Sequence, residues 1–306
     1  MIKERALSSA PAALSLKPAP PAASKSAPPK RQFDSRYVAP LVITAILIIG
    51  QVSYGILESY PKTLLAIGCS ILSEIALSFL IYRKFPHLAS AYVSGISCGI
   101  LIRSPLIWPF ALVAVLSILS KYVLRLHGRH LWNPSNFGIS AMLFLAPVAV
   151  ASLSQQFSNS VWPMLTIWVL GSVILWRLKR LHICVAYVSA FVLFAALRAA
   201  LPGHHDQGLW PAFVGEVAPV TGPVYQLFIF FMITDPKSTV QGVGPQMAVA
   251  ASVAAVECVL RLTGNVHAPY YALFLVGPTA NLMEMALRNW QKKQGLAPAA
   301  AGLAAA

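Results

Sequence analysis

TLLAIGCSILSEIALSFLIY (63–82) is a run of twenty residues in which Glu74 is the one charged side chain. An α-helix rises 1.5 Å per residue, so such a run covers about 30 Å, the thickness of the hydrocarbon core of a bilayer. Nine further apolar runs of comparable length surround it. The sequence therefore predicts ten membrane-spanning helices, at residues 38–57, 63–82, 88–103, 106–124, 134–153, 161–176, 182–201, 218–234, 244–261 and 269–287.

The composition of the 306-residue chain supports this prediction. Hydrophobic residues make up 57% of the chain and charged residues only 10%, values that soluble domains do not show. The net charge of +14 would suggest nucleic-acid binding in a soluble protein, but here the basic residues cluster between the apolar runs. The charge therefore indicates orientation in a lipid bilayer and not a nucleic-acid partner.

The distribution of Lys and Arg predicts that both termini are cytoplasmic. With the N-terminus inside, 19 of the 23 basic residues fall in the tails or in cytoplasmic loops. The four on the other side are Lys62, Arg103, Arg198 and Arg261. This asymmetry predicts a multi-pass membrane protein with both termini on the cytoplasmic side.

Three segments follow from these boundaries. Residues 1–36 are rich in Ala, Pro and Ser with scattered basic residues, which predicts a disordered cytoplasmic tail. Seven Lys or Arg residues in this tail leave an electrostatic tether to anionic lipid as the alternative. Residues 37–290 form the predicted ten-helix membrane domain, and residues 291–306 form a short Ala-rich cytoplasmic tail.

The third and eighth predicted spans are short and interrupted by Gly or Pro. They occupy the same place in each half of a five-plus-five arrangement, and an odd number of spans per half makes the two halves inverted. Ser94-Gly95 in the first half corresponds to Thr221-Gly222 in the second. Interrupted helices at matching positions of inverted repeats indicate a binding site near the middle of the bilayer.

Two polar segments stand out at the predicted cytoplasmic helix ends: GRHLWNPSNFGISAMLFLAP (128–147) and FFMITDPKSTV (230–240). Together with SAYVSGISCGILIRSP (90–105), they resemble the NqrB/RnfD family, whose members are membrane subunits of the sodium-pumping NADH:quinone reductase and of Rnf electron-transport complexes. The family's Asn-Pro-Ala-x-x-Gly helix is matched by Asn133, Pro134, Ser135 and Gly138. Its Phe-Phe-x-x-Thr-Asp-Pro helix is matched by Phe230, Phe231, Thr234, Asp235 and Pro236. The resemblance covers residues 60–290 and is closest to the single-chain members labelled enediyne biosynthesis protein UnbU.

The resemblance implies an inverted-repeat fold in the bacterial inner (plasma) membrane and a role in transmembrane electron transport or redox-linked movement of Na⁺ or H⁺. It also implies redox partner subunits and flavin as the redox group. In the family, the Thr of a Ser-Gly-Ala-Thr motif carries covalent FMN between spans five and six. The corresponding loop here, ASLSQQFSNSVWP (151–163), contains no Thr and no Gly. This difference argues against covalent FMN and leaves noncovalent flavin, FMN or riboflavin, as the expected cofactor.

Residues expected to contact such a cofactor come from the two polar segments and from the interruption in the eighth span. For Asn133 and Asn136, the alternatives are helix capping around a first-turn proline and an anion site at the helix N-terminus. For Asp235, the alternatives are a turn carboxylate and a contact to an ion, flavin or partner. The full set is Arg129, His130, Asn133, Ser135, Asn136, Gly138, Thr221, Gly222, Thr234 and Asp235.

Acidic residues within spans are costly and usually are paired or line a pathway. Glu74 lies near the middle of its span and is the strongest candidate for an ion or solute pathway, to which Asp235, Glu257 and Glu284 are added. Glu257 precedes Arg261 by four residues, and Glu284 precedes Arg288 by four. Structural i,i+4 pairing is therefore the alternative for these two.

No catalytic residue set or metal site is predicted. Cys69, Cys98, Cys184 and Cys258 lie at different depths of the bilayer, which argues against a shared iron–sulfur cluster. His204, His205 and Asp206 form a polar triplet without a second pair of ligands at zinc-like spacing. The sequence leaves three functions open: electron transport or redox-linked ion movement, cofactor-free transport of a small solute or metabolite, and a scaffold role.

Overall fold

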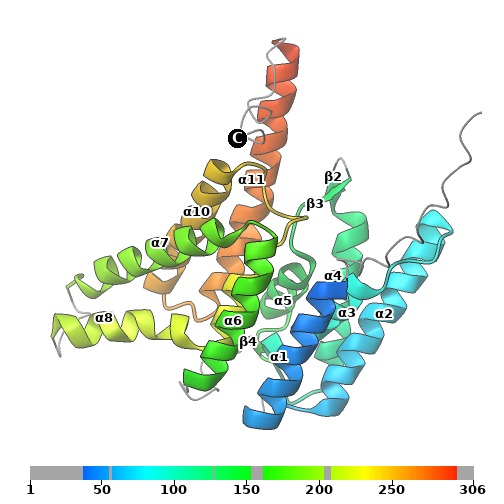
Figure 1. The fold of residues 1–306 in the computed structure, drawn as a ribbon, viewed down its shortest axis with the longest axis horizontal. Coiled ribbons are helices and arrows are strands. Elements are labelled where there is room, and N and C mark those ends of the chain that lie inside the picture. Colours follow the sequence, from blue (N-terminus) through cyan, green and yellow to red (C-terminus); the bar gives the residue numbers. More distant parts are fainter. Residues whose placement is uncertain (1–36, 55–56, 127, 153–160, 203–207, 295–306) are drawn as a thin grey trace, which may run out of the picture. The chain divides into compact units, whose positions relative to one another are not determined.

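The structure is a computed structural model that describes residues 37–54, 57–126, 128–152, 161–202 and 208–294. The predicted all-α class is confirmed. In order, the elements are α1 (Val38–Tyr54), α2 (Tyr60–Tyr82), α3 (Ala89–Leu101), β1 (Ile102–Arg103), α4 (Trp108–Val123), β2 (Arg125–Leu126), β3 (Arg129–His130), α5 (Pro134–Leu145), β4 (Ala151–Ser152), α6 (Val161–Arg177), α7 (Leu181–Ala199), α8 (Leu209–Val217), the 3₁₀-helix η2 (Ala218–Thr221), α9 (Pro223–Leu227), the π-helix η3 (Phe228–Met232), α10 (Val243–Leu262) and α11 (Ala268–Lys293) (Figure 1). The predicted disordered tail 1–36 and the triplet His204, His205 and Asp206 lie outside the described residues.

Three helices among the described residues are long and apolar enough to cross a membrane: α2, α7 and α10. A fourth span results if the two legs α8–η2 and α9–η3, which are bent by 66° at Gly222, are counted as one. Four further apolar helices are shorter, at Pro40–Val52, Ala89–Leu101, Trp108–Val123 and Met164–Arg177. The described helices are therefore those of a membrane protein.

The predicted helix at 134–153 is wrong in its second half. α5 has 12 residues and ends at Leu145, just before Pro147. α3 has only 13 residues, so each helix covers about 20 Å, less than the hydrocarbon thickness. α3 runs directly into β1, and residues 146–150 connect α5 to β4. The two strands pair antiparallel, placing Ile102 opposite Ser152. Because the strands pair with each other and Ile102 is fully buried, this extended backbone is satisfied within the protein.

The buried face of α2 is polar and its exposed face is apolar. Thr63, Ser70, Glu74 and Ser78 are buried, whereas Leu64, Leu72, Phe79 and Leu80 are more than half exposed. In water this arrangement would expose a large apolar surface, but in lipid the exposed side chains lie in an apolar solvent. α2 thus has an apolar exposed face and a polar seam turned toward α3 and α4.

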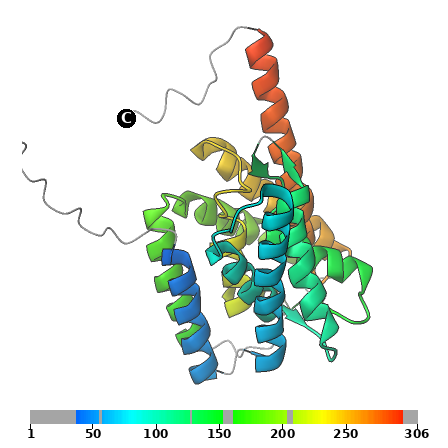
Figure 2. The ribbon, with the colours of Figure 1, turned by 90° about the vertical axis from the view of Figure 1, so that its right-hand side faces the viewer.

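Most helices pack on helices that are close to them in the chain. α2 packs on α3 and α4, and α4 packs on α5; later, α7 packs on α8 and α10, and α10 packs on α11. α1 contacts α6, and α5 contacts α11. Figure 2 shows α1 and α6 side by side. Contacts between early and late helices therefore occur through α1–α6 and α5–α11.

Close packing of α4 and α5 requires Gly138. A Cβ atom at this position would lie 2.1 Å from Ser117 Oγ and 2.5 Å from the Val113 carbonyl oxygen. Small residues let helix backbones approach closely in membranes. Gly138, which we expected to contact a cofactor, thus has a packing role.

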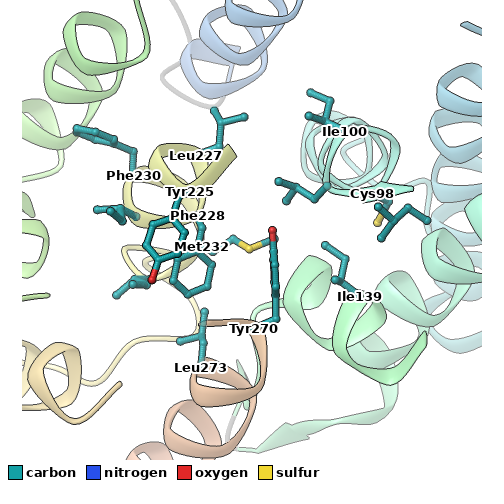
Figure 3. Close-up of a cluster of buried hydrophobic side chains, with 14 of the residues drawn as sticks. Cys98, Ile100, Ile139, Tyr225, Leu227, Phe228, Phe230, Met232, Tyr270 and Leu273 are labelled. Carbon is teal, nitrogen blue, oxygen red and sulfur yellow. The ribbon is translucent and has the colours of Figure 1, made fainter. Parts of the chain in front are cut away.

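The core contains an aromatic cluster around Phe228 of η3. Phe228 is fully buried, and its ring centroid lies 6.1 Å from that of Tyr187, 5.9 Å from Tyr225 and 5.5 Å from Tyr270. Figure 3 shows these residues of η3, α9 and α11 facing Cys98 and Ile100 of α3 and Ile139 of α5. The interrupted segment α9–η3 therefore lies in the middle of the core.

Candidate functional site

The two polar motifs meet in space at Asn133 and Asp235. Asn133 Oδ1 accepts a hydrogen bond from the Asn136 amide (3.0 Å), so the residue caps α5 while Pro134 occupies its first turn. Asn133 Nδ2 points the other way, 3.4 Å from Asp235 Oδ2 and 3.5 Å from the Met232 carbonyl oxygen. Capping is therefore confirmed, and the same side chain also joins the two motifs. We call this meeting point the motif site.

Asp235 organises the turn that follows η3. Its carboxylate accepts hydrogen bonds from the Ser238 hydroxyl (2.7 Å) and the Lys237 amide (3.2 Å), and its carbonyl oxygen accepts one from the Thr239 hydroxyl (2.6 Å). Asp235 is thus a turn carboxylate that additionally contacts Asn133. Thr234 is buried and donates to the Phe230 carbonyl oxygen (2.5 Å), so its hydroxyl is used within its own segment.

Asn281 of α11 fastens the loops of both motifs. Its Nδ2 donates to the carbonyl oxygens of Leu131 (3.1 Å) and Ser238 (2.7 Å). The side chain is 1% exposed, and its Oδ1 has no hydrogen-bond partner within the described part of the chain. Sequence reasoning missed this residue, although a lone amide inside an apolar run is the signal that identifies it.

An ion-pair network closes the polar end of the motif site. Arg129 Nη1 lies 3.0 Å from Glu284 Oε2, and Arg129 Nη2 also donates to the Thr239 carbonyl oxygen. Glu284 Oε1 accepts from Arg288 (2.7 Å) and from the Gln241 amide (3.0 Å). The expected i,i+4 pair of Glu284 with Arg288 is confirmed, and Arg129 is an additional partner.

Two charged or titratable groups beside this network are electrostatically perturbed. Burial, with Arg125, Lys121 and Lys237 nearby, lowers the pKa of His130 to about 4, so the imidazole is neutral at pH 7. Burial also lowers the pKa of Arg180, whose Nη1 lies 3.5 Å from the Thr234 carbonyl oxygen. The motif site is therefore rich in cationic groups.

The remaining expected contact residues separate into two places. Ser135 and Asn136 are buried in the first turn of α5, where Asn136 Nδ2 donates to the Tyr270 carbonyl oxygen (3.2 Å). Thr221 and Gly222 lie instead at the bend between η2 and α9, where the Thr221 hydroxyl donates to the Ala218 carbonyl oxygen (2.6 Å). The hydrogen bond of the Thr221 hydroxyl thus stays within the bend, whereas Asn136 is bonded to the start of α11.

A cavity at the motif site has room for about one water molecule. Its volume is about 20 Å³, and its lining includes Trp132, Asn133, Met232, Thr239 and Gln246. Ligand pockets for drug-sized molecules are typically about 300–1,000 Å³. An isoalloxazine ring does not fit there. A larger hollow of about 360 Å³ lies at the α6–α7 turn and is lined by Leu175, Trp176, Arg177, Lys179, Leu181 and His182. None of these residues is among those expected to bind flavin.

Glu74 forms a buried ion pair between α2 and α4. Its Oε1 lies 2.5 Å from Lys121 Nζ and 3.0 Å from the Tyr122 hydroxyl, and Lys121 also donates to Ser90 Oγ (2.8 Å). Glu74 Oε2 and, one helical turn earlier, Ser70 Oγ are buried without a hydrogen-bond partner among the described residues. Lys121, one of the basic residues counted on the cytoplasmic side, is the counter-charge of Glu74 in the last turn of α4.

Glu257 of α10 is the second buried carboxylate. It is fully buried, and Arg261 Nε lies 2.8 Å from its Oε1, which confirms the expected i,i+4 pair. The hydroxyls of Tyr187 and Tyr225 also donate to it. Sequence reasoning missed both tyrosines.

The described residues contain no group of three or more His, Cys, Asp or Glu side chains placed to hold a metal ion. No protein-family model matches the chain, and no curated protein matches it.

Proposed function

We propose that this chain is a ten-span protein of the bacterial inner membrane, built from two inverted halves, that moves a small cation, H⁺ or Na⁺, across the bilayer in a redox-linked process. The resemblance to membrane proteins of the Rnf and NADH:quinone reductase complexes suggests the redox link, and the polar seam of α2 suggests the ion pathway. The observation that carries the proposal is the buried Glu74 carboxylate with one unpartnered oxygen.

Helix packing supports the inverted repeat. If α8–η2 and α9–η3 together count as the eighth span, then α2, α3, α4 and α5 correspond to α7, the bent segment, α10 and α11. The contacts α2–α3, α2–α4 and α4–α5 then match α7–α8, α7–α10 and α10–α11. The same correspondence places an interrupted or shortened helix third in each half, as expected of a central site built from broken helices.

The environment of Glu74 supports cation movement. Its carboxylate is 3% exposed in a predicted span, and intramembrane acids of this kind commonly line ion pathways. Lys121 occupies only one carboxylate oxygen, so the other, with Ser70 Oγ nearby on the same helix face, is left to bind a proton or Na⁺. Buried Thr63 and Ser78 extend this polar face toward both ends of α2.

Electron transfer on this proposal depends on a separate redox partner protein. The motif site holds about one water molecule and does not fit a flavin, so we assign no redox step to this chain's own residues. Asn133, Asp235 and Asn281 instead hold the two halves together at one end. A partner that docks near this joint would bias the ion pathway through the relative position of the halves.

The test is ion flux into proteoliposomes. The purified protein is reconstituted, a membrane potential is imposed with K⁺ and valinomycin, and entry of H⁺ and of ²²Na⁺ is measured. We expect flux of one of the two ions in the wild type, its loss in Glu74→Gln, and its retention in Glu58→Gln. Glu58 is a suitable control because it pairs with Lys62 (2.6 Å) next to the same helix but is partly exposed. Absence of both fluxes in the wild type would overturn the proposal.

A second candidate is cofactor-free transport of a small solute, because the cavity at the motif site is too small for a flavin. The visible absorption spectrum of the purified protein, recorded before and after incubation with FMN and riboflavin, tests a feature that both candidates share. A flavin band would contradict the absence of a flavin in this chain, on which both candidates rest. A colourless protein that exchanges a solute between liposomes, with no cation flux, would establish the second candidate.

A further inference from the structure

Arg198 is a buried cation whose hydrogen-bonding capacity is largely unused. It lies in the last turn of α7, at the end of the helix away from the motif site, and is only 2% exposed. Its Nε donates to Glu216 Oε2 of α8 (2.7 Å). Its two terminal nitrogens, Nη1 and Nη2, are buried and have no hydrogen-bond partner in the described part of the chain.

The geometry of this ion pair leaves two donors of the guanidinium, Nη1 and Nη2, without a hydrogen-bond partner in the described part of the chain. Glu216 takes the single Nε–H at the side, so the Nη1 and Nη2 pair remains free. Two parallel N–H groups of this kind match the two oxygens of a carboxylate or phosphate, and such bidentate pairs are the strongest charge-assisted hydrogen bonds. A buried guanidinium left without these bonds loses hydration that nothing replaces.

The surroundings hold Arg198 in place. Its Cζ lies 5.7 Å from the centroid of the Phe191 ring, a cation–π contact that fixes the guanidinium. Arg261 contacts the same ring at 5.6 Å, but its Nε and Nη2 are already bonded to Glu257 and Tyr225. Two arginines therefore contact the Phe191 ring. Arg261 has hydrogen-bond partners for its Nε and Nη2, whereas Arg198 has none for its Nη1 and Nη2 in the described part of the chain.

The position also connects Arg198 with the interrupted segment. Glu216 belongs to α8, the first leg, and Tyr225 belongs to α9, the second leg. Each leg is thus bonded to one of the two arginines on Phe191. Glu216 keeps 26% of its side-chain exposure, so the ion pair reaches from the protein surface to the buried guanidinium.

We propose that Arg198 binds an oxyanion, a carboxylate or phosphate group, through Nη1 and Nη2 at this end of the bundle. The ligand approaches past Glu216 and completes the hydrogen bonding of the guanidinium. This inference is independent of cation movement through the α2 seam, because it rests on different helices and different residues.

The test is a titration of the purified full-length protein in a maltoside detergent, at constant ionic strength balanced with chloride. The shift of the thermal unfolding midpoint is followed with inorganic phosphate, acetate and short-chain phosphatidylglycerol as probes. We expect a saturable rise in the midpoint with at least one probe relative to chloride. A response to phosphate or acetate identifies a soluble ligand, and a response to the lipid alone identifies a lipid headgroup.

Variants assign the response to the guanidinium. Arg198→Lys keeps the charge but not the paired donors, so we expect the affinity to fall at least about tenfold. Arg261→Lys is the matched control, with the same ring contact, and should retain the affinity. Glu216→Gln removes the competing carboxylate next to the site and should raise the affinity about tenfold.

A wild-type protein that responds to no probe would overturn the proposal, as would Arg198→Lys responding with the wild-type affinity. If Arg198→Lys does not fold, Glu216→Gln decides: unchanged or weakened affinity contradicts an oxyanion at Arg198. Because the readout is anion binding, these outcomes leave the ion-flux test of the proposed function unaffected.

Discussion

The Glu74–Lys121 pair should show strong energetic coupling between its two charges. The charged atoms lie 2.5 Å apart, and the side chains of Lys121 and Glu74 are only 12% and 4% exposed. At an effective dielectric constant of about 20, the Coulomb attraction is about 6–7 kcal/mol. Desolvation of two ions costs several kcal/mol each, so the net contribution of the intact pair to stability is small.

Removing one charge of the pair should destabilise the protein more than removing both charges. Lys121→Met leaves the carboxylate with only the Tyr122 hydroxyl, and Glu74→Gln leaves the ammonium with Ser90 Oγ. Each should lower the free energy of unfolding by about 3–5 kcal/mol, because a buried charge is left uncompensated. The free energy of unfolding of the double variant should be lowered by about 1–2 kcal/mol less than that of the more destabilised single variant. The coupling energy between the two charges is then above about 3 kcal/mol.

The assay is a double-mutant cycle of detergent-solubilised protein, unfolded reversibly by titration with sodium dodecyl sulfate. Glu58 and Lys62 provide the matched control, since they pair at 2.6 Å but keep 23% and 16% of their side-chain exposure. Their coupling should stay below about 1 kcal/mol. A Glu74–Lys121 coupling energy no larger than that of the control pair would refute this prediction.

Three further predictions concern the motif site and its support. Gly138→Ala should lower the thermal unfolding midpoint, because the added Cβ costs about 1–3 kcal/mol or more of stability. Gly68→Ala is the control and should not lower the midpoint, because a Cβ there meets nothing within 4 Å. Equal midpoints for the two variants would contradict the packing of α4 on α5. Burial lowers the pKa of His130 in the folded protein to about 4, so between pH 6.5 and 4 the unfolded chain binds a proton that the folded chain does not. The contribution of His130 to the free energy of unfolding is therefore complete above pH 6.5 and falls by about 2–3 kcal/mol as the pH approaches 4. Differential scanning fluorimetry should show this slope weakened in His130→Gln, and an unchanged slope would refute it. Asn133→Ala and Asp235→Asn should reduce ion flux several-fold with membrane insertion intact; wild-type flux in both would remove the motif site from the mechanism.

Local features of the structure were predictable from the sequence. A proline after an asparagine predicted the start of α5, and a four-residue spacing predicted the ion pairs Glu257–Arg261 and Glu284–Arg288. These features depend on residues close in the chain, where helix geometry alone fixes the distance. The two Pro-containing motifs were also identified as polar helix ends, and they do meet, at Asn133 and Asp235.

Contacts between distant residues were not predictable in the same way. Lys121 was counted among the basic residues on the cytoplasmic side, but the sequence did not show that the helix rotation of α4 turns it toward Glu74. Tyr187 and Tyr225 were missed as partners of Glu257 because only the packing of α7, α9 and α10 brings them together. Hydropathy reports that a helix is apolar and does not report which face it buries.

The length of α5 was overestimated for a related reason. Residues after Leu145 are as apolar as those before, so hydropathy alone extends the helix to 153. Pro147 ends it, and the following residues reach β4, whose pairing with β1 supplies the backbone hydrogen bonds. A strand pair of two residues leaves no periodic signal in the sequence.

The central claim is that the Glu74 carboxylate binds the transported cation. Carbodiimide labelling followed by mass spectrometry tests it most directly, because dicyclohexylcarbodiimide enters apolar regions and reacts with protonated carboxyl groups. We predict labelling at Glu74 that is suppressed by Na⁺ if Na⁺ is the ion, or by raising the pH alone if the ion is H⁺. An unlabelled Glu74, or labelling that neither Na⁺ nor pH changes, would contradict the account.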